Sequence, residues 1–99
     1  MSNFESHIYG SKPVVVDFFA EWCGPCKLMT PVLQQVKQAA GDRVTVLKMD
    51  IDKNPGFTHR YSVQAVPTLI IFKDGQVIWR KSGVVPAHEI MQHLNTVMS

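Results

Sequence analysis

Two short apolar stretches separated by a longer amphipathic one limit the possible folds of this chain more than any other feature. Residues 14–19 (Val-Val-Val-Asp-Phe-Phe) and 43–49 (Arg-Val-Thr-Val-Leu-Lys-Met) are rich in β-branched and aromatic side chains, which is typical of strands. Between them, apolar residues recur at helical spacing and comprise Met29, Val32, Leu33, Val36 and Ala40. The order strand, helix, strand predicts a right-handed crossover that leaves the two strands parallel.

The central helix has predicted limits of its own. The helical pattern starts at Cys23, and Gly41 supplies a C-terminal stop. Pro31 lacks a backbone N–H and collides with the preceding turn, so we expect a kink there. A shorter helix over residues 3–9 is expected to end at the Ser-Lys-Pro sequence of residues 11–13.

The second half of the chain predicts two antiparallel strands between helices. Asn54 as N-cap and a proline in the first turn predict a short helix through about residue 61. Residues 68–72 and 77–79 form a predicted hairpin, because Asp-Gly at residues 74–75 accepts the positive φ angles of a tight type I′ turn. A final helix opens at Pro86 with a core-facing stripe of Ala87, Ile90, Met91, Leu94, Val97 and Met98. The expected fold class is α/β, a central mixed sheet with helices on both faces.

The composition suits one core and no highly charged partner. With 99 residues, of which 45% are hydrophobic and 18% charged, the chain can form one domain over residues 1–99. Ten basic and 8 acidic side chains leave a formal charge of +2, too small to indicate nucleic acid or an anionic membrane surface. The amino end shows no basic leader followed by an apolar run, and no stretch is long enough to span a bilayer. These features predict a cytoplasmic protein, in a compartment that keeps thiols mostly reduced.

The two cysteines of the chain lie where the first strand gives way to the helix. Cys23 and Cys26, separated by Gly24 and Pro25, are expected one helical turn apart at the positive end of the helix dipole, which stabilises a thiolate. We interpret Cys23 as the attacking nucleophile and Cys26 as the resolving thiol, because the residue at the mouth of the helix is expected to be the more accessible.

Other uses of the cysteine pair fit less well. A structural disulfide closing so short a loop contributes only about 2 kcal/mol in the chain-entropy model, and a reducing compartment opposes it. Haem attachment needs a histidine after the second cysteine, where this chain has Lys27. A zinc site is not indicated, because the histidines occur at no recognisable ligand spacing: His7, His59, His88 and His93.

Several motifs together resemble the thioredoxin family over nearly the whole chain. They are residues 16–27 (Val-Asp-Phe-Phe-Ala-Glu-Trp-Cys-Gly-Pro-Cys-Lys), Pro31, Lys48, residues 66–68 (Val-Pro-Thr) and Gly83. The resemblance implies a protein-disulfide reductase that works by dithiol–disulfide exchange through a mixed disulfide. It also implies no bound cofactor, only the reversible disulfide of the cysteine pair, with electrons from NADPH through a flavin-containing thioredoxin reductase. The expected substrates are disulfide-containing proteins, and the expected state is a monomer.

The resemblance assigns catalytic roles to two charged residues. Asp17 interrupts an apolar run, and its burial would raise its pKa and suit it to accept the proton of Cys26. Lys48 shares a strand face with Val44 and Val46, from which its head is expected to reach Asp17 and moderate the energy of the carboxylate. The alternatives are a structural aspartate and a solvated lysine at the edge of the sheet.

A substrate surface is expected around the cysteines. A cis peptide bond explains why Pro67 stands at the start of a strand, and the resemblance places it facing the cysteines. Val66 would then present free backbone groups to an extended substrate segment. A shallow apolar groove would be shaped by Trp22, Gly24, Pro25, Ile51 and Gly83. The alternative for each residue is local packing or turn geometry.

The chain departs from the family pattern at two points. Only thirteen residues precede residue 14, so the first strand of the family is expected to be missing and the sheet to have about four strands. The strand over residues 43–49 would then be a sheet edge, guarded by Arg43 and Lys48. Phe19 stands where many relatives have Trp, which affects the packing of the site and the preference for partners.

Two rival functions remain open on the sequence. A binding module would use the surface around Trp22, Val66 and Gly83 without redox turnover, and would keep its function without the cysteines. An oxidase or isomerase of the same fold would differ mainly in its reduction potential. The Gly-Pro dipeptide at residues 24–25 resembles the reducing members of the family.

Overall fold

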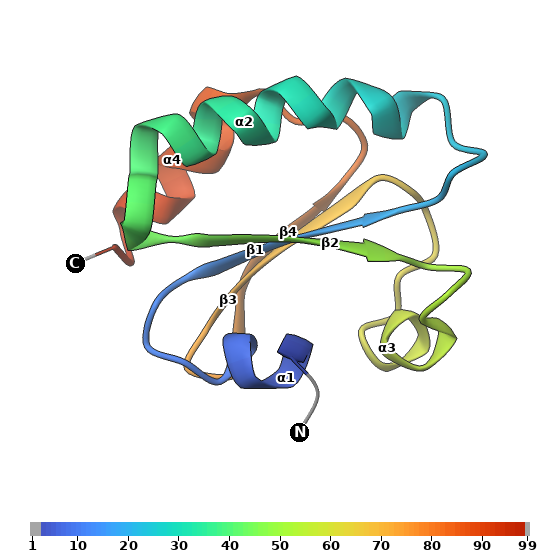
Figure 1. The fold of residues 1–99 in the computed structure, drawn as a ribbon, viewed down its shortest axis with the longest axis horizontal. Helices are drawn as coiled ribbons and strands as arrows, with labels where there is room; N and C mark the ends of the chain where they lie inside the picture. The colour runs from blue at the N-terminus through green and yellow to red at the C-terminus, as the bar shows by residue number, and fades with distance from the viewer. Residues whose placement is uncertain (1–2, 99) are drawn as a thin grey trace.

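A four-stranded sheet forms the centre of the computed structural model, which describes residues 3–98 (Figure 1). Its strands are β1 (Val14–Phe19), β2 (Thr45–Asp50), β3 (Thr68–Lys73) and β4 (Gln76–Ser82), in the order β2-β1-β3-β4. β1 is parallel to β2 and antiparallel to β3, and β3 is antiparallel to β4. This confirms the predicted mixed sheet, and it confirms that β2 lies at the edge of the described sheet with only β1 beside it.

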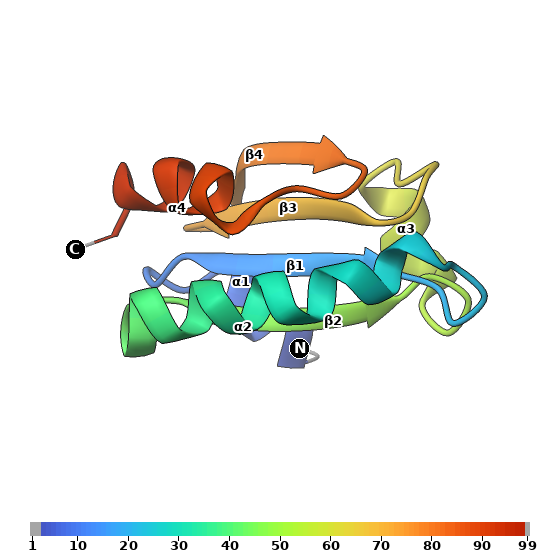
Figure 2. The same ribbon diagram turned by 90° about the horizontal axis from the view of Figure 1, so that it is seen from above.

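Helices cover both faces of this sheet (Figure 1). They are α1 (Asn3–Ile8), α2 (Met29–Ala40), α3 (Pro55–Arg60) and α4 (Ala87–Asn95), with 3-10 turns η1 (Pro25–Leu28) and η2 (Gly41–Arg43) before and after α2. The helices α2 and α4 lie on one face, and α1 and α3 lie on the other. Seen from above, α2 runs over β1 and β2 while α4 lies on the side of β3 and β4 (Figure 2). The predicted sandwich of a sheet between helices is therefore present.

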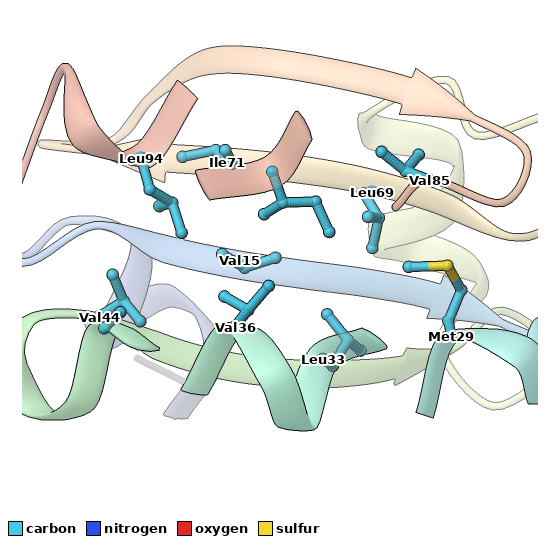
Figure 3. Packing of buried hydrophobic residues seen from close by; sticks show 11 residues of the cluster. Val15, Met29, Leu33, Val36, Val44, Leu69, Ile71, Val85 and Leu94 are labelled. Carbon is cyan, nitrogen blue, oxygen red and sulfur yellow. The ribbon is translucent and has the colours of Figure 1, made fainter. Parts of the chain in front are cut away.

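Successive residues of β1 fill two separate cores, because side chains of a strand point alternately to opposite faces. Val15 belongs to the cluster under α2 and α4, where Val36 lies beside it and Leu94 lies beside Ile71 (Figure 3). Phe18 belongs to the cluster under α1 and α3. Full burial of one such side chain contributes about 1.5–3 kcal/mol, so the alternation fixes which face each residue of β1 presents. Asp17 and Phe19 thereby face the α2 side, at the end of the strand that leads to the cysteines.

The helix after β1 begins differently from the prediction. Its first turn is the 3-10 turn η1, and the α-helix starts at Met29 rather than at Cys23. Pro31 consequently lies in the first turn of α2, where backbone N–H groups have no intrahelical partner, so proline removes no hydrogen bond there. The helix changes type just before Pro31, where the sequence predicted a kink. Gly41 ends α2 with a φ of 60°, as predicted.

Arg43 and Asn54 do not make the contacts predicted for them. Arg43 belongs to η2 rather than to β2, and its guanidinium donates to the carbonyls of Ala39 and Ala40. It therefore does not guard the strand edge, which falls to Lys48 alone of the predicted pair. Asn54 stands at the N-cap of α3 but makes no capping hydrogen bond with its side chain, because its amide donates to the carbonyl of Asp50 at 2.9 Å.

Candidate active site

The cysteine pair forms a disulfide just beyond the end of β1. Cys23 and Cys26 have Cα atoms 5.4 Å apart, and Cys26 lies in η1. A backbone hydrogen bond of 3.1 Å from the N–H of Cys23 to the carbonyl of Ala20 turns the chain out of the strand. The sulfurs form a small cluster with Ala20, against which three partly buried side chains pack: Phe19, Ile51 and Val66.

One hydrogen bond makes the two sulfurs unequal. The N–H of Cys26 donates to Sγ of Cys23 at 3.2 Å. An N–H group directed at a sulfur stabilises negative charge there, so the geometry favours a thiolate at Cys23. The expected difference in access is wrong for this oxidised form, because Cys23 and Cys26 are each 5% exposed. The inequality of the pair therefore comes from the backbone and not from exposure.

Asp17 is the buried charged group behind the cysteines. Its side chain is 0% exposed, and neither carboxylate oxygen has a hydrogen-bond partner among residues 3–98. Desolvation by burial raises the pKa of Asp17 from 3.8 to about 6, against the smaller opposing effect of the Lys48 ammonium. The predicted burial and the predicted direction of the pKa shift are both confirmed. A carboxyl group with a pKa near neutrality can take up and release a proton at physiological pH.

Lys48 pairs with Asp17 in the register of β1 and β2, but its ammonium makes other contacts. Nζ donates to Oγ1 of Thr30 at 3.3 Å and lies 5.3 Å from the centre of the Phe19 ring. The predicted direct contact with Asp17 is not seen, because among residues 3–98 neither carboxylate oxygen of Asp17 has a hydrogen-bond partner. The ammonium acts on that carboxyl through its charge alone, which lowers the pKa of Asp17. A pocket of about 320 Å³ joins this lysine to the disulfide, and its lining comprises Phe19, Ala20, Glu21, Cys26, Lys27, Thr30 and Lys48.

The structure brings part of the predicted substrate surface to the disulfide. Ile51 and Val66 pack against the cysteine cluster from two separate loops. The peptide bond between Val66 and Pro67 is cis, as predicted. Gly83, with a φ of 98°, donates its N–H to the carbonyl of Pro67 at 2.8 Å, which ties the end of β4 to the start of β3.

The remaining members of the predicted surface flank the cysteines. Trp22 is 70% exposed, and its indole Nε1 donates to Oδ2 of Asp52 at 2.9 Å. Gly24 and Pro25 are exposed as well, and a Cβ atom added at Gly24 would meet nothing within 4 Å. A bulky exposed ring beside open space leaves room for an approaching chain next to the disulfide.

Two residues of this site were not predicted from the sequence. Asp52 comes two residues after the end of β2, and the ends of parallel strands meet at the same edge of a sheet, so the sequence contained a signal for its place near Trp22. Thr30 lies 18 residues from Lys48 in the sequence, and no motif connects the two.

The described part of the chain contains neither a cluster of metal ligands nor a membrane-spanning helix. Within residues 3–98, no group of three or more His, Cys, Asp or Glu side chains is placed to hold a metal ion. None of the helices in the same range is long and apolar enough to cross a membrane. Of the histidines, His93 is half-buried and stacks on Trp79 with ring centroids 4.6 Å apart, so it is more than an ordinary surface residue.

A disulfide across a four-residue turn just beyond the end of a buried strand, with a buried carboxyl behind it, is typical of the class of dithiol–disulfide oxidoreductases. The family model described as Thioredoxin matches residues 1–96, and the chain belongs to the thioredoxin family. A thioredoxin of Alicyclobacillus acidocaldarius subsp. acidocaldarius is 42% identical over 97 residues, which cover 98% of this chain and 92% of the relative.

Two further relatives support the assignment. The chloroplastic thioredoxin Y of Oryza sativa subsp. japonica is 44% identical over 87 residues, which are 88% of this chain and 52% of that protein. A mutant thioredoxin from Halobacterium salinarum NRC-1 has a similar structure, with a TM-score of 0.88 at 27% identity, over 100% of this chain and 86% of that chain. The chain therefore has the thioredoxin fold and is a thiol–disulfide oxidoreductase that reduces protein disulfides.

Proposed function

We propose that Cys23 attacks substrate disulfides, that Cys26 resolves the mixed disulfide, and that Asp17 accepts the proton of Cys26. The observation that carries this order of events is the hydrogen bond of 3.2 Å from the N–H of Cys26 to Sγ of Cys23. It favours the thiolate at Cys23 in the reduced protein, and the thiolate is the form that attacks disulfides.

In the first step, the Cys23 thiolate forms a bond to one sulfur of the substrate disulfide. The substrate S–S bond breaks, and its other sulfur leaves as a thiolate that takes a proton from solvent. The surface around the disulfide suits this encounter, because Val66 packs beside the cysteines and Trp22 is exposed next to them. An extended substrate segment would pair with the backbone of Val66, as a strand adds to a sheet.

In the second step, Cys26 loses its proton to the Asp17 carboxylate and attacks Sγ of Cys23. The bond between Cys23 and the substrate breaks, and the substrate sulfur leaves as a thiolate that takes a proton from solvent or from Asp17. The protein finishes with the Cys23–Cys26 disulfide, having passed two electrons to the substrate. Asp17 suits the role of base because its carboxylate oxygens have no other hydrogen-bond partner among residues 3–98 and its pKa is raised to about 6.

Each turnover leaves the protein oxidised, so it needs a source of two electrons. We assign this role to NADPH acting through a flavin-containing thioredoxin reductase. The cytoplasm is the proposed compartment, because a reducing environment returns a cysteine pair of this kind to the dithiol. The chloroplastic relative from rice identifies the alternative compartment. The proposed state is a monomer, since Lys48 on the free edge of β2 discourages pairing with another strand.

Single-turnover kinetics of Asp17→Asn test the assignment of the base. We expect attack by Cys23 to keep nearly its wild-type rate, while release of the second substrate thiol slows by about 10-fold or more at pH 7. Asp42→Asn removes an exposed carboxyl far from the sulfurs and serves as the matched control. If Asp17→Asn left both steps unchanged, Asp17 would not be the base.

A further inference from the structure

The hydrogen bond between Thr30 and Lys48 joins two elements that flank the active site. Thr30 lies on the first turn of α2 and Lys48 on the edge strand β2, and the distance from Nζ to Oγ1 is 3.3 Å. The centre of the Phe19 ring of β1 lies 5.3 Å from the same ammonium. An exposed lysine thus has two contacts, one with a hydroxyl and one with an aromatic ring.

The position of this contact separates two hollows along α2. One is the pocket that reaches Cys26, and the other is a groove lined by Thr30, Leu33, Gln34, Lys37, Val46 and Lys48. Thr30 and Lys48 are the two residues that line both. Release of the hydroxyl contact would let the long lysine side chain leave the Cys26 pocket for the groove or for solvent.

We propose that Thr30 is a positioning residue, whose hydroxyl, together with the Phe19 ring, holds the Lys48 ammonium beside Asp17 and so sets the ionisation of that carboxyl. This inference rests on the proposed function in one respect only, namely that Asp17 accepts the proton of Cys26. Within the described residues 3–98, Thr30 donates to or accepts from neither the sulfurs nor Asp17, and its hydroxyl accepts from Lys48, so it acts through Lys48.

The charged groups around Asp17 leave Lys48 as the main electrostatic control. Lys48 on β2 is the charge that lowers the pKa of Asp17, against the larger effect of burial. Glu21 and Lys27 line the Cys26 pocket together with Lys48, and Lys37 of α2 lines the neighbouring groove. Lys37 is already engaged, because its Nζ donates to the carbonyls of Gly41 and Val44.

A carboxyl-carbon NMR titration of the oxidised protein tests the proposal without any turnover. In Thr30→Val, which keeps the shape and loses the hydroxyl, we expect the pKa of Asp17 to rise by about 0.2–0.7 units, the range for loosening a partly solvated charge pair. Thr30→Ser keeps the hydroxyl and should stay within about 0.1 unit of the wild type. In a Lys48→Gln background, Thr30→Val should have no effect, because the charge that it positions is gone.

The outcomes separate this inference from the assignment of the base. Equal Asp17 pKa values in Thr30→Val and wild type, or equal shifts in the valine and serine variants, would overturn the positioning role. A shift that persists in the Lys48→Gln background would also overturn it, since Thr30 would then act by packing. Unchanged kinetics in Asp17→Asn, with the titration result as expected, would remove the base and leave the positioning of Lys48 in place.

Discussion

Asp17 carries an energetic cost that its position makes unavoidable. Its neighbours on β1 are fully buried apolar residues, and its own side chain is 0% exposed with no hydrogen-bond partner among residues 3–98. A carboxylate in such a place is destabilising whenever it is charged, which is why its pKa rises to about 6. A residue that lowers stability at neutral pH is well explained by the proton transfer proposed for it.

The stability of the protein should therefore depend on pH through Asp17. The pKa of Asp17 is about 6 in the folded protein and near 3.8 when unfolded, so the folded state binds the extra proton between these values. Its favourable contribution is complete below about pH 3.8 and is lost as pH rises through about 6. Asp17→Asn should abolish this dependence and raise the free energy of unfolding at pH 7 by about 3 kcal/mol, measured by urea denaturation.

The exposed carboxyl of Asp42 provides the comparison. Asp42→Asn should leave the stability curve between pH 4 and pH 8 within about 0.5 kcal/mol of the wild type. Two results would show that burial does not raise the pKa of Asp17. One is a wild-type free energy of unfolding that stays constant across the same pH range, and the other is an Asp17→Asn variant that is no more stable than the wild type at pH 7.

Among the elements, the turn between β3 and β4 has a second task. Asp74 and Gly75 have φ values of 54° and 79°, as expected of the predicted tight turn. The same turn donates to the end of α1, from the N–H of Gly75 to the carbonyl of Ile8 at 2.7 Å and from Asp74 to Gly10 at 3.0 Å. The hairpin therefore holds the first helix on the sheet.

Gly75→Ala should lower the free energy of unfolding by about 1–2 kcal/mol, because an L-residue is strained at positive φ. The added Cβ would also meet the Tyr9 ring at 2.5 Å and displace it. Gly56→Ala is the matched control, since Gly56 lies in α3 with nothing within 4 Å of its added Cβ, and it should be neutral or stabilising by up to about 1 kcal/mol. Equal urea midpoints for the two variants would contradict the role assigned to the turn.

The strand β2 lies at the edge of the described sheet, where β1 is its one partner strand. The N–H of Ile51 donates to the carbonyl of Phe19 in β1, and that of Thr45 donates to the carbonyl of Pro13 just before β1. Every second residue of β2 therefore directs its N–H and carbonyl groups away from β1. Two carbonyl groups on this open side, at the two ends of the strand, accept hydrogen bonds. Lys37 donates to the carbonyl of Val44, and the N–H of Asn54 donates to the carbonyl of Asp50. Between them, the charge of Lys48 protects the open edge from pairing.

The features predicted best from the sequence are those set by residues close together in the chain. Residues 14–19 form β1 as expected, because a run of β-branched and aromatic residues suits only a buried strand. Gly41 ends α2 and the Asp-Gly turn closes the hairpin, because each requires a backbone conformation that few residues adopt. Local competition caused the errors at Arg43 and Asn54, whose side chains found nearer backbone carbonyls.

Contacts between distant segments were beyond the sequence. The equal exposure of Cys23 and Cys26 follows from loops that close over both sulfurs, which bring Ile51 and Val66 against them. The hydrogen bond that makes the sulfurs unequal depends on the turn geometry of residues 23–26 and not on residue type. Periodicity assigns a residue to a face, but distances between faces are set by packing.

At the scale of the whole molecule, the fold places one reactive pair at the end of a rigid sheet. The parallel strands β1 and β2 end on the same side, which gathers the cysteines, Trp22 and Asp52 there. The clusters on both faces anchor β1, so the chemistry takes place on a loop held by a fixed scaffold. The proposed mechanism depends on a difference between the two sulfurs, and removal of each in turn is the most direct test of that difference.

Trapping experiments with single-cysteine variants measure the difference in reactivity between Cys23 and Cys26. The reduced Cys26→Ser variant keeps the attacking thiolate and lacks the group that resolves the adduct, so it should accumulate mixed disulfides with proteins of a cell extract. Cys23→Ser should trap almost none and should fail to reduce insulin with dithiothreitol as the electron donor. Adducts are separated on a non-reducing gel and identified by mass spectrometry. Strong trapping by Cys26→Ser alone is the predicted result, and equal trapping by both variants, or by neither, would contradict the roles assigned to the two sulfurs.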